Sequence, residues 1–252
     1  MTTNRFFVHP RQIKRTFIYL DGNEHHHLSR VARIKTSELI QLFDDSGREF
    51  IGKVEKIEKN KTIIRVLKET EVMDDKVKIS LAQALLKSKS MELVIQKAAE
   101  LGAHSFFPLL SERCVVRPKE KQALKLIRWR KISLEASKQS GRGIVCRIDP
   151  PGSQEEILEN SQAELKLLLS ESTEGEKLLK DILLTPLLSR DKKTGFPSSV
   201  LLIVGPEGGW TEMEQNYMIN SGCTAVSLGK FVLRSETAAV ASLAMISHFW
   251  NV

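Results

Sequence analysis

Hydrophobic and polar residues alternate over the first quarter of the chain. Within residues 13–67, four stretches have the two-residue period of half-buried β-strands. These stretches are 17–20, 38–43, 50–54 and 62–67. The sequence Asp44-Asp45-Ser46-Gly47, between the second and third, is typical of a hairpin turn. The pattern predicts a small β-barrel domain over residues 1–72.

A polar connection follows, after which strand patterns alternate with helical ones. Apolar runs of the kind found in buried parallel strands lie at 77–83, 105–108, 165–169, 200–204 and 225–228. Helical spacing and capping signals predict helices at 91–101, 120–140, 211–221 and 236–250. We therefore expect an α/β domain with a mainly parallel sheet over residues 73–252.

The composition, with 41% hydrophobic and 27% charged residues, is that of a folded globular chain and excludes coiled coil and general disorder. No stretch approaches 18 uninterrupted apolar residues, and the first residues lack a secretion signal, so we expect neither a membrane span nor export. Cys114, Cys146 and Cys223 are far apart, which argues against a disulfide framework and a CxxC metal site. A cytoplasmic protein fits best.

Positive charge is concentrated in one block. Residues 111–147 hold 11 Lys or Arg and 3 Glu, whereas residues 149–181 hold 9 acidic residues and 3 Lys. Such a block, with Trp129 inside it, suits a nucleic acid, because Lys and Arg neutralise phosphates and Trp can stack on bases. The alternative is an ordinary solvated helix face. The candidate RNA-binding residues are Arg5, Arg113, Arg117, Arg128, Arg130 and Arg142.

A glycine-rich segment, Gly205-Pro206-Glu207-Gly208-Gly209, directly follows the apolar run at 200–204. Glycines at the carboxyl end of a strand let the backbone approach a ligand closely, and open α/β sheets bind ligands at that edge. The segment is neither a GxGxxG fingerprint nor a phosphate-binding loop, which disfavours NAD and ATP. We interpret it as a ligand-binding loop; the alternative is a tight strand-to-helix turn.

A second segment, Leu228–Ala238, also runs from a strand through a loop into a helix. Arg234 and Glu236 are charges beside an otherwise apolar helix, so they need partners or a chemical role. From composition alone, Ser235 could instead be the helix N-cap and Arg234 a surface residue.

These two segments, in this order, resemble the cofactor loops of the SPOUT (trefoil-knot) RNA methyltransferases. The chain is further similar, over almost its whole length, to the ribosomal small-subunit (16S) RNA uridine-N3 methyltransferases. The segments that carry this similarity are Asn4–Phe7, His26–Val31, Met91–Gly102, Ser111–Arg113 and Glu135–Arg142. The chain departs from the family pattern at Ser90, Lys230-Phe231 and Ser235, where the family more often has Arg, Pro-Arg and Thr.

The resemblance implies a PUA-like β-barrel for RNA, a knotted α/β domain that binds S-adenosylmethionine, and a homodimer with its active site at the subunit interface. It implies methylation of N3 of a specific uridine in ribosomal RNA or the small ribosomal subunit. The implied cofactor-binding residues are Leu169, Ser170, Val204, Gly205, Pro206, Glu207, Gly208, Gly209, Leu228, Gly229, Val232, Leu233, Arg234, Thr237 and Ala238. A related enzyme acting on another RNA atom and a non-catalytic RNA-binding protein remain alternatives.

The implied chemistry asks the site to favour an anion, because uridine N3 must lose its proton to attack a methyl group. A guanidinium suits this task, since it stays charged and presents a planar fork. Arg234 is the first candidate, with Glu236 holding it or accepting the proton. Arg5, at a flexible amino end, could also reach the substrate.

No metal is expected. His25, His26 and His27 are consecutive and cannot all face one ion, so His26 and His27 are better interpreted as the start of a short helix or as RNA contacts. Cys223 is expected to be a small core residue.

Overall fold

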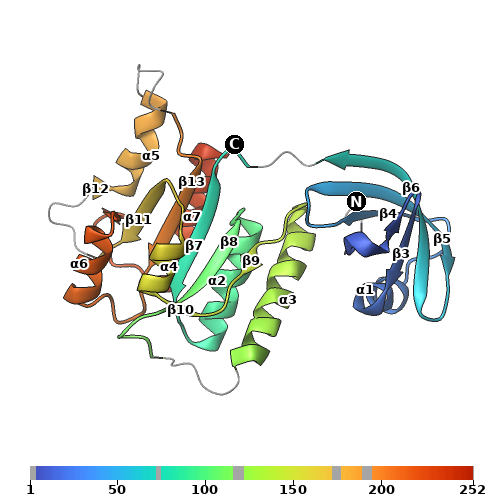
Figure 1. Ribbon diagram of the computed structural model, residues 1–252, viewed down its shortest axis with the longest axis horizontal. Coiled ribbons are helices and arrows are strands. Elements are labelled where there is room, and N and C mark those ends of the chain that lie inside the picture. Colours follow the sequence, from blue (N-terminus) through green and yellow to red (C-terminus); the bar gives the residue numbers. More distant parts are fainter. Residues whose placement is uncertain (1–3, 72–74, 116–121, 172–176, 189–194, 252) are drawn as a thin grey trace. The chain divides into compact units, whose positions relative to one another are not determined.

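The computed structural model describes residues 4–71, 75–115, 122–171, 177–188 and 195–251 (Figure 1). They form two compact units. The first comprises residues 1–74 together with 137–145, and the second comprises 75–136 and 146–252. The pattern along the chain gave no sign that residues 137–145 group with the first unit, and the domain boundary expected near residue 73 stays a prediction.

The first unit is built on one six-stranded sheet, with the strand order β1-β4-β5-β6-β3-β2. Its strands are β1 (Arg5–Phe7), β2 (Ile13–Lys14), β3 (Phe17–Asp21), β4 (Leu39–Phe43), β5 (Arg48–Ile57) and β6 (Lys61–Glu71). All neighbouring strands are antiparallel except β1 and β4. The four predicted strands are confirmed. The two that the pattern missed, β1 and β2, have only three and two residues, too few to show a period.

The predicted hairpin turn between β4 and β5 is also confirmed. Asp45 and Gly47 take positive φ values of 66° and 89°, and the carboxylate of Asp44 accepts hydrogen bonds from the backbone and hydroxyl of Ser46. Inward-facing side chains of the sheet form the core of this unit. They include Phe6, Ile18, Leu20, Ile40, Phe50 and Ile64.

Three short helical segments accompany the sheet: η1 (Pro10–Gln12), α1 (Gly22–His26) and the π-helical turn η2 (His27–Val31). The expectation that His26 and His27 start a short helix holds only for His27, which begins η2, because α1 already begins at Gly22 and contains His26. RNA contact by these histidines stays a prediction. His25 is buried, and its Nδ1 lies 2.8 Å from the hydroxyl of Thr62. This histidine therefore joins α1 to β6.

The second unit contains a parallel sheet, as predicted. Its strands are β7 (Lys78–Ala84), β8 (Ser105–Leu110), β9 (Arg147–Ile148), β10 (Gly152–Ser153), β11 (Leu165–Leu169), β12 (Lys177–Leu178), β13 (Ser199–Val204) and β14 (Thr224–Ser227). The order is β10-β8-β7-β13-β11-β14-β12, with β9 beside β8, and every pair is parallel. The carboxyl ends of β11, β13 and β14 therefore meet at one edge of the sheet.

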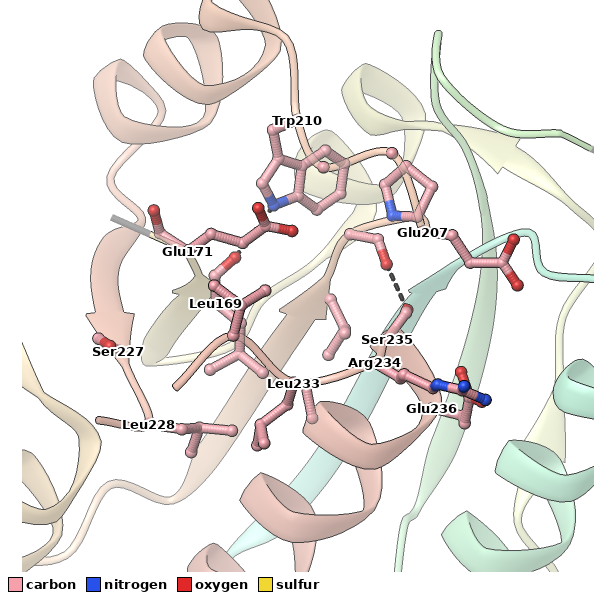
Figure 2. Close-up of a pocket in the computed structure, with 18 of the residues that line it drawn as sticks. Leu169, Glu171, Glu207, Trp210, Ser227, Leu228, Leu233, Arg234, Ser235 and Glu236 are labelled. Atoms are coloured by element: carbon pink, nitrogen blue, oxygen red, sulfur yellow. Dashed lines mark hydrogen bonds between the residues drawn. The ribbon is translucent and has the colours of Figure 1, made fainter. Parts of the chain in front are cut away.

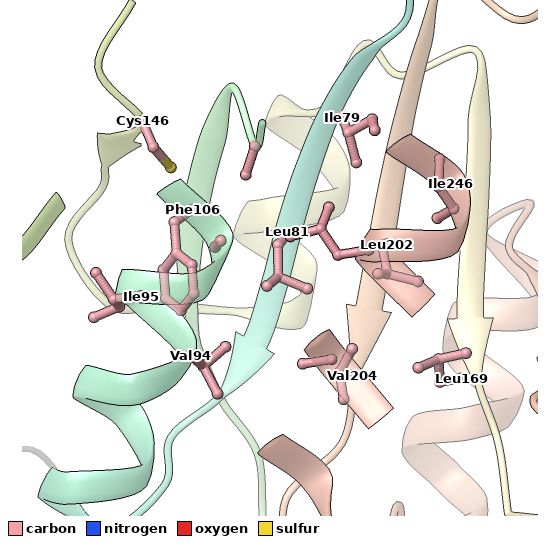
Figure 3. Close-up of a cluster of buried hydrophobic side chains, with 14 of the residues drawn as sticks. Ile79, Leu81, Val94, Ile95, Phe106, Cys146, Leu169, Leu202, Val204 and Ile246 are labelled. Carbon is pink, nitrogen blue, oxygen red and sulfur yellow. The ribbon is translucent and has the colours of Figure 1, made fainter. Parts of the chain in front are cut away.

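Both faces of this sheet are covered, which explains its continuous apolar strands. Along β13, Val200, Leu202 and Val204 belong to one apolar cluster and Leu201 and Ile203 to another. Figure 3 shows the first cluster, in which side chains of β7 and β13 pack with those of the helices α2 (Ser88–Glu100) and α7 (Ser235–Trp250). The second cluster includes residues of α4 (Gln154–Asn160) and α6 (Glu212–Asn220).

The remaining helices are α3 (Gln122–Ser140), whose residues 137–140 group with the first unit, and α5 (Leu179–Leu188). The four predicted helices are confirmed, although Glu120, the expected start of α3, lies outside the described residues. Two helices were missed, α4 in the acidic stretch and α5 at its end. The first of them, α4, begins with a capping box in which Ser153 and Glu156 satisfy each other's backbone amides, so its acidic first turn complements the helix dipole.

Candidate active site

A cavity of about 620 Å³ opens where β11, β13 and β14 end (Figure 2). It is lined by residues 169–171 after β11, by 204–210 after β13, and by much of 227–238 between β14 and the first turn of α7. Its size lies within the range of roughly 300–1,000 Å³ found for ligand sites. The ligand-binding edge predicted from the glycine segment therefore carries a real cavity.

The structure brings nearly all predicted cofactor residues to this cavity. The lining includes Leu169, Ser170, Val204, Gly205, Pro206, Glu207, Gly208, Gly209, Leu228, Gly229, Val232, Leu233, Arg234 and Ala238, as well as Glu236. Thr237 is exposed on α7 and does not line the cavity, because successive side chains of a helix point in different directions. Sequence reasoning did not select Ser90, Glu171, Trp210, Gln215, Ser227, Phe231 or Ser235, which also line it.

The glycine loop packs too closely for most side chains. Gly209 has a φ of +68°, and its amide donates to the carbonyl of Pro206 in a tight turn. A Cβ at Gly205 would lie 3.0 Å from the Trp210 ring, and one at Gly208 would lie 3.3 Å from the Cβ of Arg113. The segment is thus a tight turn and a cavity wall at once, so the two interpretations of it are compatible.

Two side chains outside the loop hold it in place. Arg113 donates from Nη1 to the carbonyls of Gly208 and Trp210, at 3.2 and 3.1 Å. Trp210 donates from Nε1 to the carbonyl of Leu169 at 3.0 Å, which joins the loop to the end of β11. Arg113, expected to contact RNA, therefore also positions the cavity wall.

Glu214, in the first turn of α6, fixes the other end of the loop. Its carboxylate accepts the amides of Glu112 and Thr211, both at 2.9 Å, and the Thr211 hydroxyl at 3.0 Å. Burial alone would raise the pKa of Glu214, but the backbone and hydroxyl hydrogen bonds that its carboxylate accepts together outweigh burial and hold that pKa below its usual value. The predicted capping box at 211–214 is confirmed. Its glutamate also binds the amide of Glu112, so it connects the start of α6 to the segment after β8.

Ser235 joins three segments of the cavity. It is the first residue of α7 and Arg234 is the N-cap, so the alternative that Ser235 caps the helix is wrong. The Ser235 hydroxyl donates to the carbonyl of Gly205 and accepts a hydrogen bond from Nε2 of the buried Gln83 at 2.9 Å. Gln83 was missed, although a polar residue at the end of an apolar strand was the available signal.

Arg234 and Glu236 lie together at the side of the cavity opposite Glu171 in the view of Figure 2. Arg234 is exposed, whereas Glu236 is half-buried, and its Oε2 is buried with no hydrogen-bond partner among the described residues. No ion pair within 4.0 Å joins Arg234 to Glu236 in this part of the chain. The structure therefore does not show Glu236 holding Arg234, and it leaves one carboxylate oxygen of this cavity-lining residue buried without a hydrogen-bond partner among the described residues.

Arg5 lies in strand β1 of the first unit, and its side chain is held by several contacts. Its guanidinium forms an ion pair with Glu49, donates to the carbonyl of Gly141 at 2.7 Å, and lies 4.8 Å from the centre of the Phe43 ring. Its side chain is only 10% exposed. Any role for Arg5 in RNA binding or catalysis stays a prediction.

Residues 122–140 of the basic block form the helix α3, and the tryptophan of this helix faces inward. Trp129 is 6% exposed and belongs to the apolar core, so the expectation that it stacks on bases is wrong. Arg128 is exposed and pairs with Glu92 through two 2.7 Å contacts, and Nε of Arg130 donates to the carbonyl of Ile148. Arg142 lies in the segment that groups with the first unit, and Arg117 lies outside the described residues.

The described residues contain neither a cluster of metal ligands nor a membrane-spanning helix. No group of three or more His, Cys, Asp and Glu residues among them could hold a metal ion. None of their helices is long and apolar enough to cross a membrane. Cys223 is buried, as predicted, and burial raises the pKa of its thiol to about 11.

Comparison with known proteins agrees with this architecture. A family model described as an RNA methyltransferase domain matches residues 73–247, and one described as an RNA methyltransferase PUA domain matches residues 20–67. The fold and cavity thus define an RNA methyltransferase with a PUA domain.

The similar proteins narrow the class. Ribosomal RNA small subunit methyltransferase E of Bacillus subtilis is 32% identical and covers 91% of this chain and 89% of its own length. The same-named enzyme of Neisseria gonorrhoeae, in a crystal structure bound to S-adenosylmethionine, is 31% identical over 98% of both chains with a TM-score of 0.83. A putative methyltransferase of Legionella pneumophila, also with bound S-adenosylmethionine, has 31% identity, 98% coverage of both chains and a TM-score of 0.84. This chain belongs to the ribosomal RNA small subunit methyltransferase E family, which confirms the resemblance seen in the sequence.

Proposed function

We propose that this protein methylates N3 of a uridine in the RNA of the small ribosomal subunit, with S-adenosylmethionine as methyl donor. The observation that carries the proposal is the cavity, which combines a glycine wall with Arg234 and a buried, unpartnered oxygen of Glu236. The names of the relatives indicate RNA of the small ribosomal subunit as the substrate, and two similar structures contain S-adenosylmethionine.

The lining residues fit such a cofactor. Leu169, Val204 and Leu228 give the cavity an apolar wall suited to a purine, and the glycine loop presents backbone rather than side chains. The lining also holds three carboxylates and two guanidiniums, so it can accept a ligand with both positive and negative groups. S-adenosylmethionine, when bound, supplies a methyl group on a positively charged sulfur.

The two charged residues at the start of α7 then have distinct tasks. Glu236, a carboxylate in the lining of the cavity, accepts the proton from uridine N3. Arg234 stabilises the negative charge that spreads over the uracil edge as N3 loses its proton. Arg234 is the N-cap residue of α7, and its exposed guanidinium is accessible to an incoming nucleotide.

A homodimer is part of the proposal, as is a cytoplasmic location. Phe231 and Val232 line the cavity with side chains that are 72% and 69% exposed, an unusual position for large apolar groups. A second subunit would cover them and help to enclose the site. Light scattering of the purified protein at several concentrations tests the dimer directly.

The reaction is tested by incubating the protein with S-adenosylmethionine and small-subunit RNA that lacks the modification, followed by mass spectrometry of the nucleosides. The expected product is 3-methyluridine. A methyl group on a ribose hydroxyl or on guanine N1 would favour the related enzyme acting on another atom. Absence of S-adenosylmethionine binding in isothermal titration would favour a non-catalytic RNA-binding protein.

Glu236→Gln separates proton transfer from binding. The amide keeps the shape of the side chain but is no longer a base, so the methylation rate should fall while the Kd for S-adenosylmethionine stays within about twofold. A normal single-turnover rate would remove Glu236 from the reaction.

A further inference from the structure

Gln83 is a fully buried polar residue near the carboxyl end of β7. In the parallel register it lies opposite Val204, the residue before the glycine loop. It is on the same face of β7 as Ile79 and Leu81, which pack in the apolar cluster that also includes residues of α7. A buried amide lowers stability unless it is hydrogen-bonded, so the partners of Gln83 decide what this residue does.

The surroundings of this amide fix its orientation. Its Nε2 lies 3.1 Å from the carbonyl oxygen of Ala84, 2.9 Å from the hydroxyl of Ser235 and 3.4 Å from the carbonyl oxygen of Gly205. Two of these groups are carbonyls, which only accept hydrogen bonds, so the nitrogen and not the oxygen of the amide must face them. Oε1 is buried and has no partner among the described residues. Gln83 therefore acts as a donor towards the cavity wall and α7.

The hydroxyl of Ser235 passes this interaction on to the glycine loop (Figure 2). A hydroxyl has a single hydrogen, and Ser235 donates it to the carbonyl of Gly205, so its oxygen is left to accept from Gln83. The result is a chain of hydrogen bonds from Nε2 of Gln83 through the Ser235 hydroxyl to Gly205. Ser235 is only 7% exposed, so water has little access to this chain, and successive buried hydrogen bonds strengthen one another.

This chain of hydrogen bonds ties the glycine loop to the start of α7. Ser235 stands between Arg234 and Glu236, so its position in the first turn of α7 sets the positions of both. The other side-chain hydrogen bonds that hold the loop come from Arg113 and Trp210, and these bonds do not involve α7. Loss of the chain should therefore leave most of the loop in place but free the start of α7.

We infer that Gln83 is a positioning residue for methyl transfer. Gln83 itself does not line the cavity; acting through Ser235, it keeps Arg234 and Glu236 at a fixed place relative to the glycine wall. The inference rests on the proposed function, because it gives the hydrogen-bond chain the task of aligning groups for that reaction. Misplacement of reacting groups by about 1 Å can slow a reaction on the order of 100-fold.

The first test breaks the chain at two points. Gln83→Met keeps the length of the side chain and removes the donor, and Ser235→Ala removes the hydroxyl. Each should lower the single-turnover rate of methylation by roughly 10- to 100-fold, while the Kd for S-adenosylmethionine stays within about threefold because the loop keeps its other supports. The double variant should be no slower than the slower single variant, because both changes break the same chain. Ser235→Thr, which retains a hydroxyl, should recover most of the rate lost in Ser235→Ala.

Ser133→Ala is the matched control. Ser133 is fully buried in the same unit, and its hydroxyl donates to the carbonyl of Cys146 at 2.6 Å. The substitution removes a buried hydrogen bond from serine to a backbone carbonyl, as Ser235→Ala does, but Ser133 does not line the cavity. It should lower the free energy of unfolding, measured in urea, and leave the methylation rate and the Kd unchanged.

A second readout needs neither cofactor nor RNA. In the amide NMR spectrum of the free protein, Gln83→Met should shift the backbone signals of Ser235 and Glu236, because the start of α7 loses its connection to the sheet. The signal of Gly208 should stay, since Arg113 still donates to its carbonyl. If Gln83→Met does not fold, the side-chain amide signals of Gln83 decide. They should exchange slowly with solvent in the wild type and faster in Ser235→Ala.

Several results would overturn the inference. They are a normal single-turnover rate in folded Gln83→Met, a defect that lies wholly in the Kd, an unmoved Glu236 signal, and fast exchange of the Gln83 amide in the wild type. Multiplication of the two single defects in the double variant would show separate roles and also contradict it. An inactive wild type would instead refute the proposed function, and the NMR signals would still decide whether Gln83 holds the start of α7.

Discussion

Gly209 offers the sharpest test of the cavity wall. Its φ of +68° lies in the left-handed region, where a residue with a Cβ costs about 1–2 kcal/mol. A Cβ there would lie 3.5 Å from Oε1 of Glu171, an ordinary contact, so the backbone alone sets the magnitude for alanine. If the variant loop relaxes when free and must return to this conformation to bind, Gly209→Ala should raise the Kd for S-adenosylmethionine by about 5- to 30-fold.

Two further substitutions at Gly209 and one at a control glycine make the test more specific. Gly209→Val should abolish measurable binding, because a β-branched residue is a strong outlier at positive φ, whereas Gly209→Asn should lose least, because asparagine tolerates that region. Gly222, which follows α6 with a φ of +89° and open space at its Cβ position, is the control. Gly222→Ala should lower the free energy of unfolding by a similar amount without changing the Kd.

Isothermal titration with S-adenosylmethionine measures the affinities, and thermal or urea unfolding measures stability. Wild-type affinity in Gly209→Ala and Gly209→Val would show that the loop conformation is irrelevant to the ligand. An equal loss of affinity in Gly222→Ala would show that the effect is general destabilisation. Either result would refute the reasoning.

Three further predictions concern Arg234, Glu214 and the arginines of α3. Arg234→Lys keeps the charge but loses the planar fork, so the single-turnover rate of methylation should fall by on the order of 100- to 1000-fold with RNA and cofactor affinities retained, and the defect should shrink as pH rises towards the uridine N3 pKa; a near-normal rate would contradict this. The pKa of Glu214 is lowered in the folded state, so its stabilisation is present above the unfolded value of about 4.5 and is lost as pH falls through the folded value. Glu214→Gln should therefore flatten the acid side of a stability–pH curve measured by urea unfolding, and an unaltered curve would disprove the linkage. Arg128→Ala with Arg130→Ala should weaken RNA binding and reduce its salt slope by roughly one unit per lost phosphate contact, whereas Glu92→Gln, which only frees Arg128, should not; an unchanged slope would place RNA elsewhere.

The fold followed from the sequence wherever the signal was local. Strand and helix periods identified the four long strands of the first unit, the five main strands of the second and four helices, and Thr211 and Glu214 identified the start of α6. The segments missed were short or polar, such as β2 with two residues and α4 in the acidic stretch. Periodicity needs several repeats to be visible, and these segments offer too few.

In the candidate site, too, local features were predictable from the sequence and long-range arrangement was not. The glycine loop and the segment around Arg234 were visible because each follows a strand directly and has an unusual composition. Their convergence depended on strand order, since β13 and β14 both flank β11 and so bring residues 204–210 and 227–238 to one edge. Order within a sheet is set by contacts between distant segments, which a single sequence does not display.

What the sequence by itself determined is therefore the nature of each segment: strand or helix, glycine turn, helix cap, and the choice of chemical groups near the cavity. Each depends on neighbours a few residues away. Only the tertiary structure decided the partners. In the folded protein the Trp129 side chain is buried in the core, Arg113 donates to the carbonyls of the glycine loop, and Gln83 donates to Ser235. Both connections link residues 95 or more positions apart. The Gln83 side chain is buried, and a polar group that folding removes from water must find its hydrogen-bond partner within the protein.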